Sequence, residues 1–115
     1  METYAHEIDG DLLILKVDGG INRGTATQLV EGVTRLVDGG VRRIVVDFSD
    51  VEMITSTGIS TLLLLSRSMR NRGAEVKLAG LHGMVAQVLQ LTRLDKIFDL
   101  YPDVGQARLA FRPRA

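Results

Sequence analysis

Short aliphatic runs separated by turn residues predict most of the β-strands in this chain. Four such runs cover residues 12–17, 43–48, 76–79 and 96–101, and residues 3–8 are a further candidate strand. The first two strands are joined by Asp9-Gly10-Asp11, so they are expected to form a β-hairpin. The run at 43–48, RIVVDF, is nearly continuously apolar, which is typical of a strand buried on both faces in a parallel sheet.

Apolar residues at helical spacing predict a helix after each of the last four strands. The helices are expected at residues 26–38, about 58–72, from between Gly80 and Gly83 to about 91, and 104–111. Thr25 is expected to cap the first of them and Gly39-Gly40 to end it. This order predicts an α/β fold, with a mixed, mostly parallel sheet of about five strands, an N-terminal β-hairpin and four helices.

The second predicted helix carries more leucines than one buried stripe can hold. Its expected core stripe consists of Ile59, Leu62, Leu63, Ser66 and Met69. Four successive leucines at 62–65 cover about 300° of a helix, so at least one of them should reach the surface or a neighbouring helix. Packing against the third helix and an apolar contact for a partner both remain open.

Length and composition limit the chain to a small aliphatic protein. With 115 residues, residues 1–115 are expected to form a single domain. Because basic and acidic residues balance at fourteen each, no nucleic acid or anionic membrane is expected as a partner. The absence of cysteine excludes disulfides and thiolate chemistry and fits a cytoplasmic protein. We expect no secretion signal and no direct membrane insertion, since the first residues are acidic and polar and no apolar run is long enough to span a bilayer.

Three hydroxyl residues and a glycine lie at the junction between the third predicted strand and the helix that follows it. Within MITSTGISTLLLL, residues 53–65, these are Thr55, Ser56, Thr57 and Gly58. One interpretation is structural, because Ser56 or Thr57 can cap the helix. The other is functional, because a phosphate on Ser56 would face the positive end of the helix dipole and free N–H groups. Such a phosphate would change the charge met by any protein that docks there.

The sequence offers little for catalysis or cofactor binding. A serine nucleophile needs a base, and neither His6 nor His82 is placed by spacing to serve Ser56, which also lacks a G-x-S-x-G context. The acids Asp47 and Asp50 flank a short turn and are expected to bond nearby backbone rather than a metal. No phosphate-binding glycine motif is present. We therefore expect no enzyme activity, no metal and no cofactor.

Three segments together resemble the STAS domains, specifically the bacterial anti-sigma factor antagonists. IVVDFSDVEMITSTGISTLLLL, residues 44–65, is similar to the family signature, in which a strand and a short turn lead to a serine and a glycine that open a helix. LKVDGGINRGTATQL, residues 15–29, and VLQLTRLDKIFDLYPDVGQAR, residues 88–108, resemble the flanking parts of the family. The resemblance thus covers almost the whole chain.

The resemblance implies a function in partner switching. The family's phosphorylatable serine falls on Ser56, and the unphosphorylated protein would bind a GHKL-type anti-sigma factor serine kinase, which then releases a sigma factor. Phosphorylation would dissociate the complex, and a PP2C-type phosphatase would reset it. The partner-binding residues implied by the resemblance are Asn22, Thr55, Ser56, Thr57, Gly58 and Ile59.

Two residues depart from the family pattern, and each removes negative charge near Ser56. The family usually has aspartate directly before the serine, where this chain has Thr55. It often has aspartate in the loop after the second strand, where this chain has Asn22. An alternative function therefore stays open, in which the chain is a non-phosphorylated STAS subunit of an ABC-type lipid transporter or of a signalling scaffold.

Overall fold

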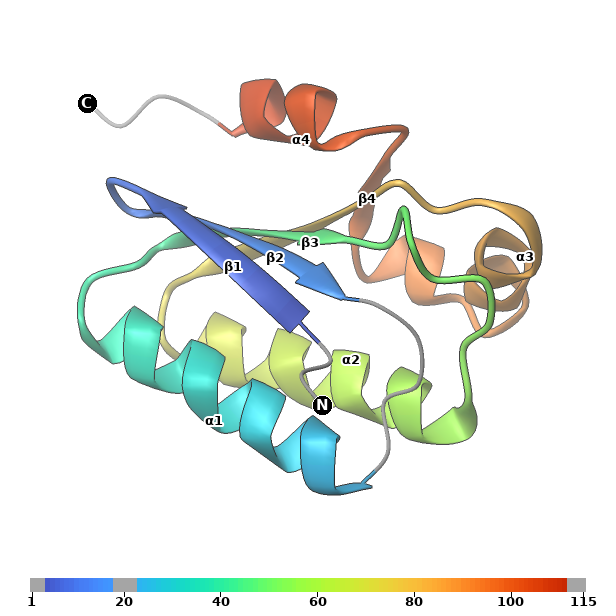
Figure 1. Cartoon of the computed structure of the whole chain (residues 1–115), viewed down its shortest axis with the longest axis horizontal. Helices are drawn as coiled ribbons and strands as arrows, with labels where there is room; N and C mark the ends of the chain where they lie inside the picture. The colour runs from blue at the N-terminus through green and yellow to red at the C-terminus, as the bar shows by residue number, and fades with distance from the viewer. Residues whose placement is uncertain (1–3, 18–22, 112–115) are drawn as a thin grey trace.

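A five-stranded mixed sheet organises the computed structural model, which describes residues 4–17 and 23–111 (Figure 1). The strands are β1 (Tyr4–Asp9), β2 (Leu12–Val17), β3 (Arg43–Asp47), β4 (Glu75–Ala79) and β5 (Asp99–Tyr101). They lie in the order β1-β2-β3-β4-β5, with β1 antiparallel to β2 and the other pairs parallel. The predicted α/β fold with an N-terminal hairpin is confirmed.

Helices cover both faces of this sheet, and two of them lie side by side on one face (Figure 1). The helices are α1 (Arg23–Asp38), α2 (Ser56–Asn71), α3 (Gly83–Leu91) and α4 (Val104–Ala110), with a 3-10 turn at Leu94–Lys96. Helices α1, α2 and α3 share the main core with the sheet, whereas α4 covers the opposite face. Parallel strands require such crossover helices, which explains why α1 and α2 run in the same direction.

The two faces of the sheet bury cores of unequal size. Alternate residues of β2, such as Leu13 and Leu15, point into the main core, and Leu12 points into the smaller core under α4. The central strand β3 buries both of its faces, since Ile44 and Val46 join the main core and Val45 the smaller one. Its nearly continuous apolar sequence was therefore a reliable indication of a central strand.

Three predicted boundaries are wrong. Thr25 lies inside α1, which begins at Arg23, and therefore does not cap it. Helix α2 begins at Ser56 rather than near Gly58. The predicted strand 96–101 forms only from Asp99, because Lys96 and Phe98 donate their N–H groups to the carbonyls of Arg93 and Leu94 in a tight turn. Apolar Phe98 is buried in the main core although it is not part of a strand.

The buried stripe of α2 is rotated from the predicted one. It consists of Gly58, Thr61, Leu62, Leu65 and Met69. Two leucines reach the surface, with exposed fractions of 42% for Leu63 and 56% for Leu64, so the assignment of Leu63 to the core is wrong. Thr61 is buried without penalty because its hydroxyl donates to the carbonyl of Thr57 at 2.7 Å. The helix packed along α2 is α1, so of the two alternatives left open for the extra leucines, packing against the third helix is not the arrangement found.

Candidate functional site

Hydrogen bonds within the loop and to the neighbouring β4–α3 connection hold the loop between β3 and α2 in place before the chain reaches Ser56. Asp47 Oδ1 accepts the N–H of Ser49 at 3.0 Å, which confirms that this acid bonds nearby backbone. The carbonyl of Ser49 lies 3.1 Å from Nε2 of His82 at the start of α3. Phe48 donates its N–H to the carbonyl of Ala79 at the end of β4. The loop is thus fixed to the neighbouring connection, and the start of α2 has a defined place at the carboxyl edge of the sheet.

Thr55, and not Ser56 or Thr57, is the N-cap of α2. Its backbone is extended, with φ −96° and ψ 171°, and its Oγ1 accepts the N–H of Gly58 at 3.2 Å. Its carbonyl accepts the N–H of Ile59 at 3.0 Å. The prediction that Ser56 or Thr57 caps the helix is therefore wrong. Ser56 is the first helical residue and is exposed, so its hydroxyl does not serve as the cap.

Replacing Thr55 by alanine should lower the free energy of unfolding by about 1 kcal/mol, because the third N–H of α2 loses its acceptor. Ser56→Ala is the matched control and should change stability by less than about 0.5 kcal/mol, since an exposed non-cap side chain is removed. Urea denaturation followed by circular dichroism measures both variants. A larger loss in Ser56→Ala than in Thr55→Ala would contradict the assigned cap.

The other expected partner-binding residues differ in accessibility. Thr57 and Ile59 are half-buried, and Ile59 packs against the main core. Gly58 is buried, and a Cβ atom placed on it would lie 2.8 Å from Cγ1 of Ile54, so this position requires glycine for close packing. Asn22 lies outside the described residues.

A groove of about 660 Å³ opens beside Ser56, between the N-terminal halves of α1 and α2. Helix α1 contributes Ala26, Thr27, Val30 and Glu31. Helix α2 contributes Ser56, Thr57, Ser60, Thr61 and Leu64. Sequence reasoning missed the residues of α1, although their spacing of one helical turn places them on one side of that helix. No signal in the sequence indicated that this side faces Ser56.

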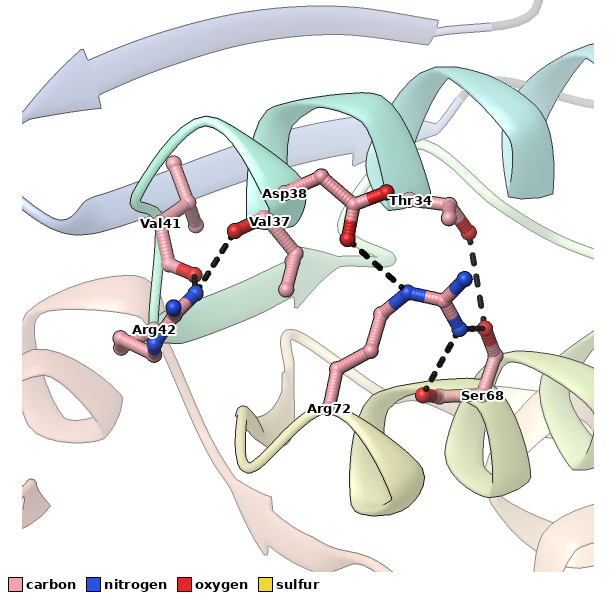
Figure 2. A network of polar contacts seen from close by, with 7 residues as sticks. All are labelled: Thr34, Val37, Asp38, Val41, Arg42, Ser68 and Arg72. Atoms are coloured by element: carbon pink, nitrogen blue, oxygen red, sulfur yellow. Dashed lines mark hydrogen bonds and ion pairs between the residues drawn. The ribbon is translucent and has the colours of Figure 1, made fainter.

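Polar contacts close the other end of the same helix pair (Figure 2). Arg72 donates to Asp38 at 3.1 Å and to Oγ of Ser68 at 2.9 Å, and Ser68 lies 3.5 Å from Oγ1 of Thr34. We call Thr34, Asp38, Ser68 and Arg72 the C-terminal clamp. Its ion pair is exposed and therefore contributes little stability by itself, but it joins α1 to α2 where the groove ends.

The described part of the chain contains neither a cluster of metal ligands nor a helix that could span a membrane. Residues 4–17 and 23–111 contain no group of three histidine or acidic side chains that could hold a metal ion. His82 bonds the backbone of Ser49, and the side chain of His6 lies outside the described set. Among the described helices, none is long and apolar enough to cross a membrane.

Comparison with known proteins agrees with the fold. The chain is 30% identical over 112 residues to a Bordetella bronchiseptica protein named "Putative anti-sigma factor antagonist BtrV", covering 97% of this chain and 96% of that protein. The crystal structure of an anti-sigma factor antagonist from Mycobacterium paratuberculosis superimposes with a TM-score of 0.80 at 27% identity, covering 96% and 94% of the two chains.

More distant structures share the fold alone. SpoIIAA from Bacillus, solved in a phosphorylated form, has a TM-score of 0.73 at 16% identity, covering 95% of this chain and 99% of SpoIIAA. The family model of the STAS domain matches residues 3–107, which include every strand and helix from β1 to β5 and the start of α4. The chain therefore belongs to the STAS domain family, and its relatives include anti-sigma factor antagonists.

Proposed function

We propose that this protein is an anti-sigma factor antagonist controlled by phosphorylation of Ser56. Unphosphorylated, it binds a GHKL-type anti-sigma serine kinase in the cytoplasm and thereby releases a sigma factor. The kinase transfers a phosphate to Ser56, the complex dissociates, and a PP2C-type phosphatase restores the binding form. In this cycle the protein is a substrate and a switch and performs no catalysis itself.

One observation supports this proposal above the others: Ser56 is exposed at the first position of α2 while Thr55 supplies the cap. A modification of Ser56 therefore leaves the capping hydrogen bond in place. The N–H groups of Ser56 and Thr57 have no acceptor within the helix, and together with the dipole they favour a negative group. The folded chain can thus carry a phosphate, whose charge acts on the bound partner.

Thr55 in place of the family's usual aspartate is compatible with this cycle. Both residue types are good N-caps, so the position keeps its structural task while it loses a negative charge. The missing charge reduces repulsion between the unmodified site and an incoming phosphate. We expect it to affect which kinase acts on Ser56 rather than whether the serine is presented.

Ser56→Asp should weaken binding to the anti-sigma kinase at least tenfold, or about 1.4 kcal/mol, while Ser56→Ala keeps it. The experiment is affinity capture from the native host with wild type, Ser56→Ala and Ser56→Asp as baits, followed by titration of the purified kinase. Gln87→Glu adds the same charge to an exposed position of α3 and is the control. Recovery of one transporter ATPase or scaffold by all baits equally would refute the proposal.

A further inference from the structure

Among the described residues, the groove beside Ser56 combines apolar surface with a single negatively charged side chain. Ala26 and Val30 from α1 and the exposed Leu64 from α2 supply apolar surface. Glu31 is the one ionisable side chain among the described residues that line it. A ligand complementary to this surface needs an apolar group and a positive charge.

Small side chains and the C-terminal clamp explain why the groove exists. Thr34 meets Ser68, and Asp38 meets Arg72, each across a separation of 34 residues (Figure 2). Helical spacing extends this separation toward Val30 and Leu64 one turn earlier and toward Ala26 and Ser60 two turns earlier, and all four residues line the groove. Because alanine and serine are short, the helices leave space between their N-terminal halves instead of filling it.

We propose that this groove is the docking surface for a segment of the anti-sigma partner in which an apolar side chain stands next to a lysine or arginine. The apolar side chain covers Leu64 and Val30, which removes exposed leucine surface from water. The basic group pairs with Glu31. This inference rests on the proposed function, because it specifies the chemistry of the partner at the same site.

A docked segment and a phosphate on Ser56 exclude one another. Ser56 lines the groove, so a docked segment lies next to its hydroxyl. A phosphate there would share the groove with Glu31, which has the same charge, and none of the described lining residues is cationic. The phosphate therefore has to remain hydrated at the end of α2, and an apolar segment placed over it would have to strip that water.

A random peptide library displayed on phage tests the groove without the natural partner. Selection uses the wild-type chain, and counter-selection uses Leu64→Gln, whose exposed position tolerates the change. We expect enriched peptides to carry an apolar residue beside lysine or arginine and to bind Glu31→Gln at least fivefold more weakly. Glu52→Gln, an exposed acid of the preceding loop that does not line the groove, should bind like wild type.

The proposal is overturned if no enriched peptide depends on Leu64, if basic residues are not enriched, or if Glu31→Gln binds as well as wild type. A second arm uses the chain with phosphoserine incorporated directly at position 56, which should bind the same peptide at least tenfold more weakly. Equal affinity would refute mutual exclusion. Because neither arm requires a host kinase, both results stand even if Ser56 proves to be unmodified in the cell.

Discussion

Replacing Gly80 by alanine should lower the free energy of unfolding by about 3 kcal/mol. Gly80 follows β4 with φ +73°, a left-handed conformation that costs an alanine roughly 1–2 kcal/mol. The new Cβ would also lie 2.9 Å from the backbone nitrogen of Ser49 and from Oδ1 of Asp47, and neither atom can move without disturbing the loop that precedes α2. Chemical denaturation followed by circular dichroism measures the loss.

Gly73→Ala is the matched control for this prediction. Gly73 also has φ +73°, but no atom lies within 4 Å of the Cβ it would gain. We expect Gly73→Ala to lower the free energy of unfolding by only about 1 kcal/mol, the cost of placing alanine in a left-handed conformation, since no neighbouring atom meets the new Cβ. Equal losses in the two variants would show that the close approach of Gly80 to the β3–α2 loop does not matter. A larger loss in Gly80→Ala would show that this glycine positions the loop leading to Ser56.

The sequence predicted the strands best where burial is extreme. β2 agrees with its predicted range and β3 within one residue, because a strand covered on both faces has to be apolar at nearly every position. Prediction failed at residues 96–98, whose composition suits a strand. Apolar composition does not distinguish Phe98, which is buried in the main core just after a 3-10 turn, from a residue paired in a sheet, since both need the same side chain.

The site was predicted in part. The hydroxyl triplet indicated a helix start, and Ser56 lies at that start. Threonine and serine are both good caps, so the sequence alone did not decide which of the three residues is extended and which is helical. Which residue becomes the cap depends on the three-dimensional path of the β3–α2 loop, which is held by the bonds of Asp47 and His82.

The groove was beyond sequence reasoning because it depends on which two helices are neighbours. From the sequence, Val30 belongs to the apolar stripe of an amphipathic helix and Glu31 to its polar side, and neither assignment indicates which helix these residues face. Only the packing of α1 along α2 brings them opposite Leu64 and Ser56. A pattern within one helix cannot specify its register against another, which depends on how both helices pack on the sheet and on each other.

Phe111 has the largest expected effect on stability among the residues on the far face of the sheet. It is 5% exposed and belongs to the smaller core with Leu12 and Val45. Its ring lies 4.9 Å from Nζ of Lys77 and 5.7 Å from Cζ of Arg43, so two cations contact the aromatic face. Both apolar burial and cation–π contacts therefore hold the chain after α4 against the sheet.

Lys77 stays charged in this setting. Burial lowers the pKa of its amine, but a 3.0 Å bond to Asp99 and the negative charge of that carboxylate more than compensate, and the pKa lies above its ordinary value. The ring of Phe111 consequently faces an ammonium group at neutral pH rather than a neutral amine. Removing the ring would leave that ammonium with Asp99 and with the ring of Tyr101, whose centroid lies 5.5 Å from Nζ, but without its contact to Phe111.

Phe111→Ala should lower the free energy of unfolding by about 3–5 kcal/mol, the range for deleting a buried aromatic ring. Phe111→Leu retains most of the apolar volume and loses the aromatic face, so it should cost about 1–2 kcal/mol. Urea denaturation compares the two variants, and a loss in the leucine variant as large as in the alanine variant would assign the stability to the cation contacts rather than to burial.

Local opening should accompany this loss. Helix α4 has seven residues, too few to be stable without tertiary contacts, so amide hydrogen exchange in Val104–Ala110 should accelerate most in Phe111→Ala. Because α4 covers the face opposite α1 and α2, partner binding by the folded fraction should remain unchanged (Figure 1). Weakened binding at full folding would instead show that the two faces of the sheet are coupled, and that the groove beside Ser56 responds to the core beneath α4.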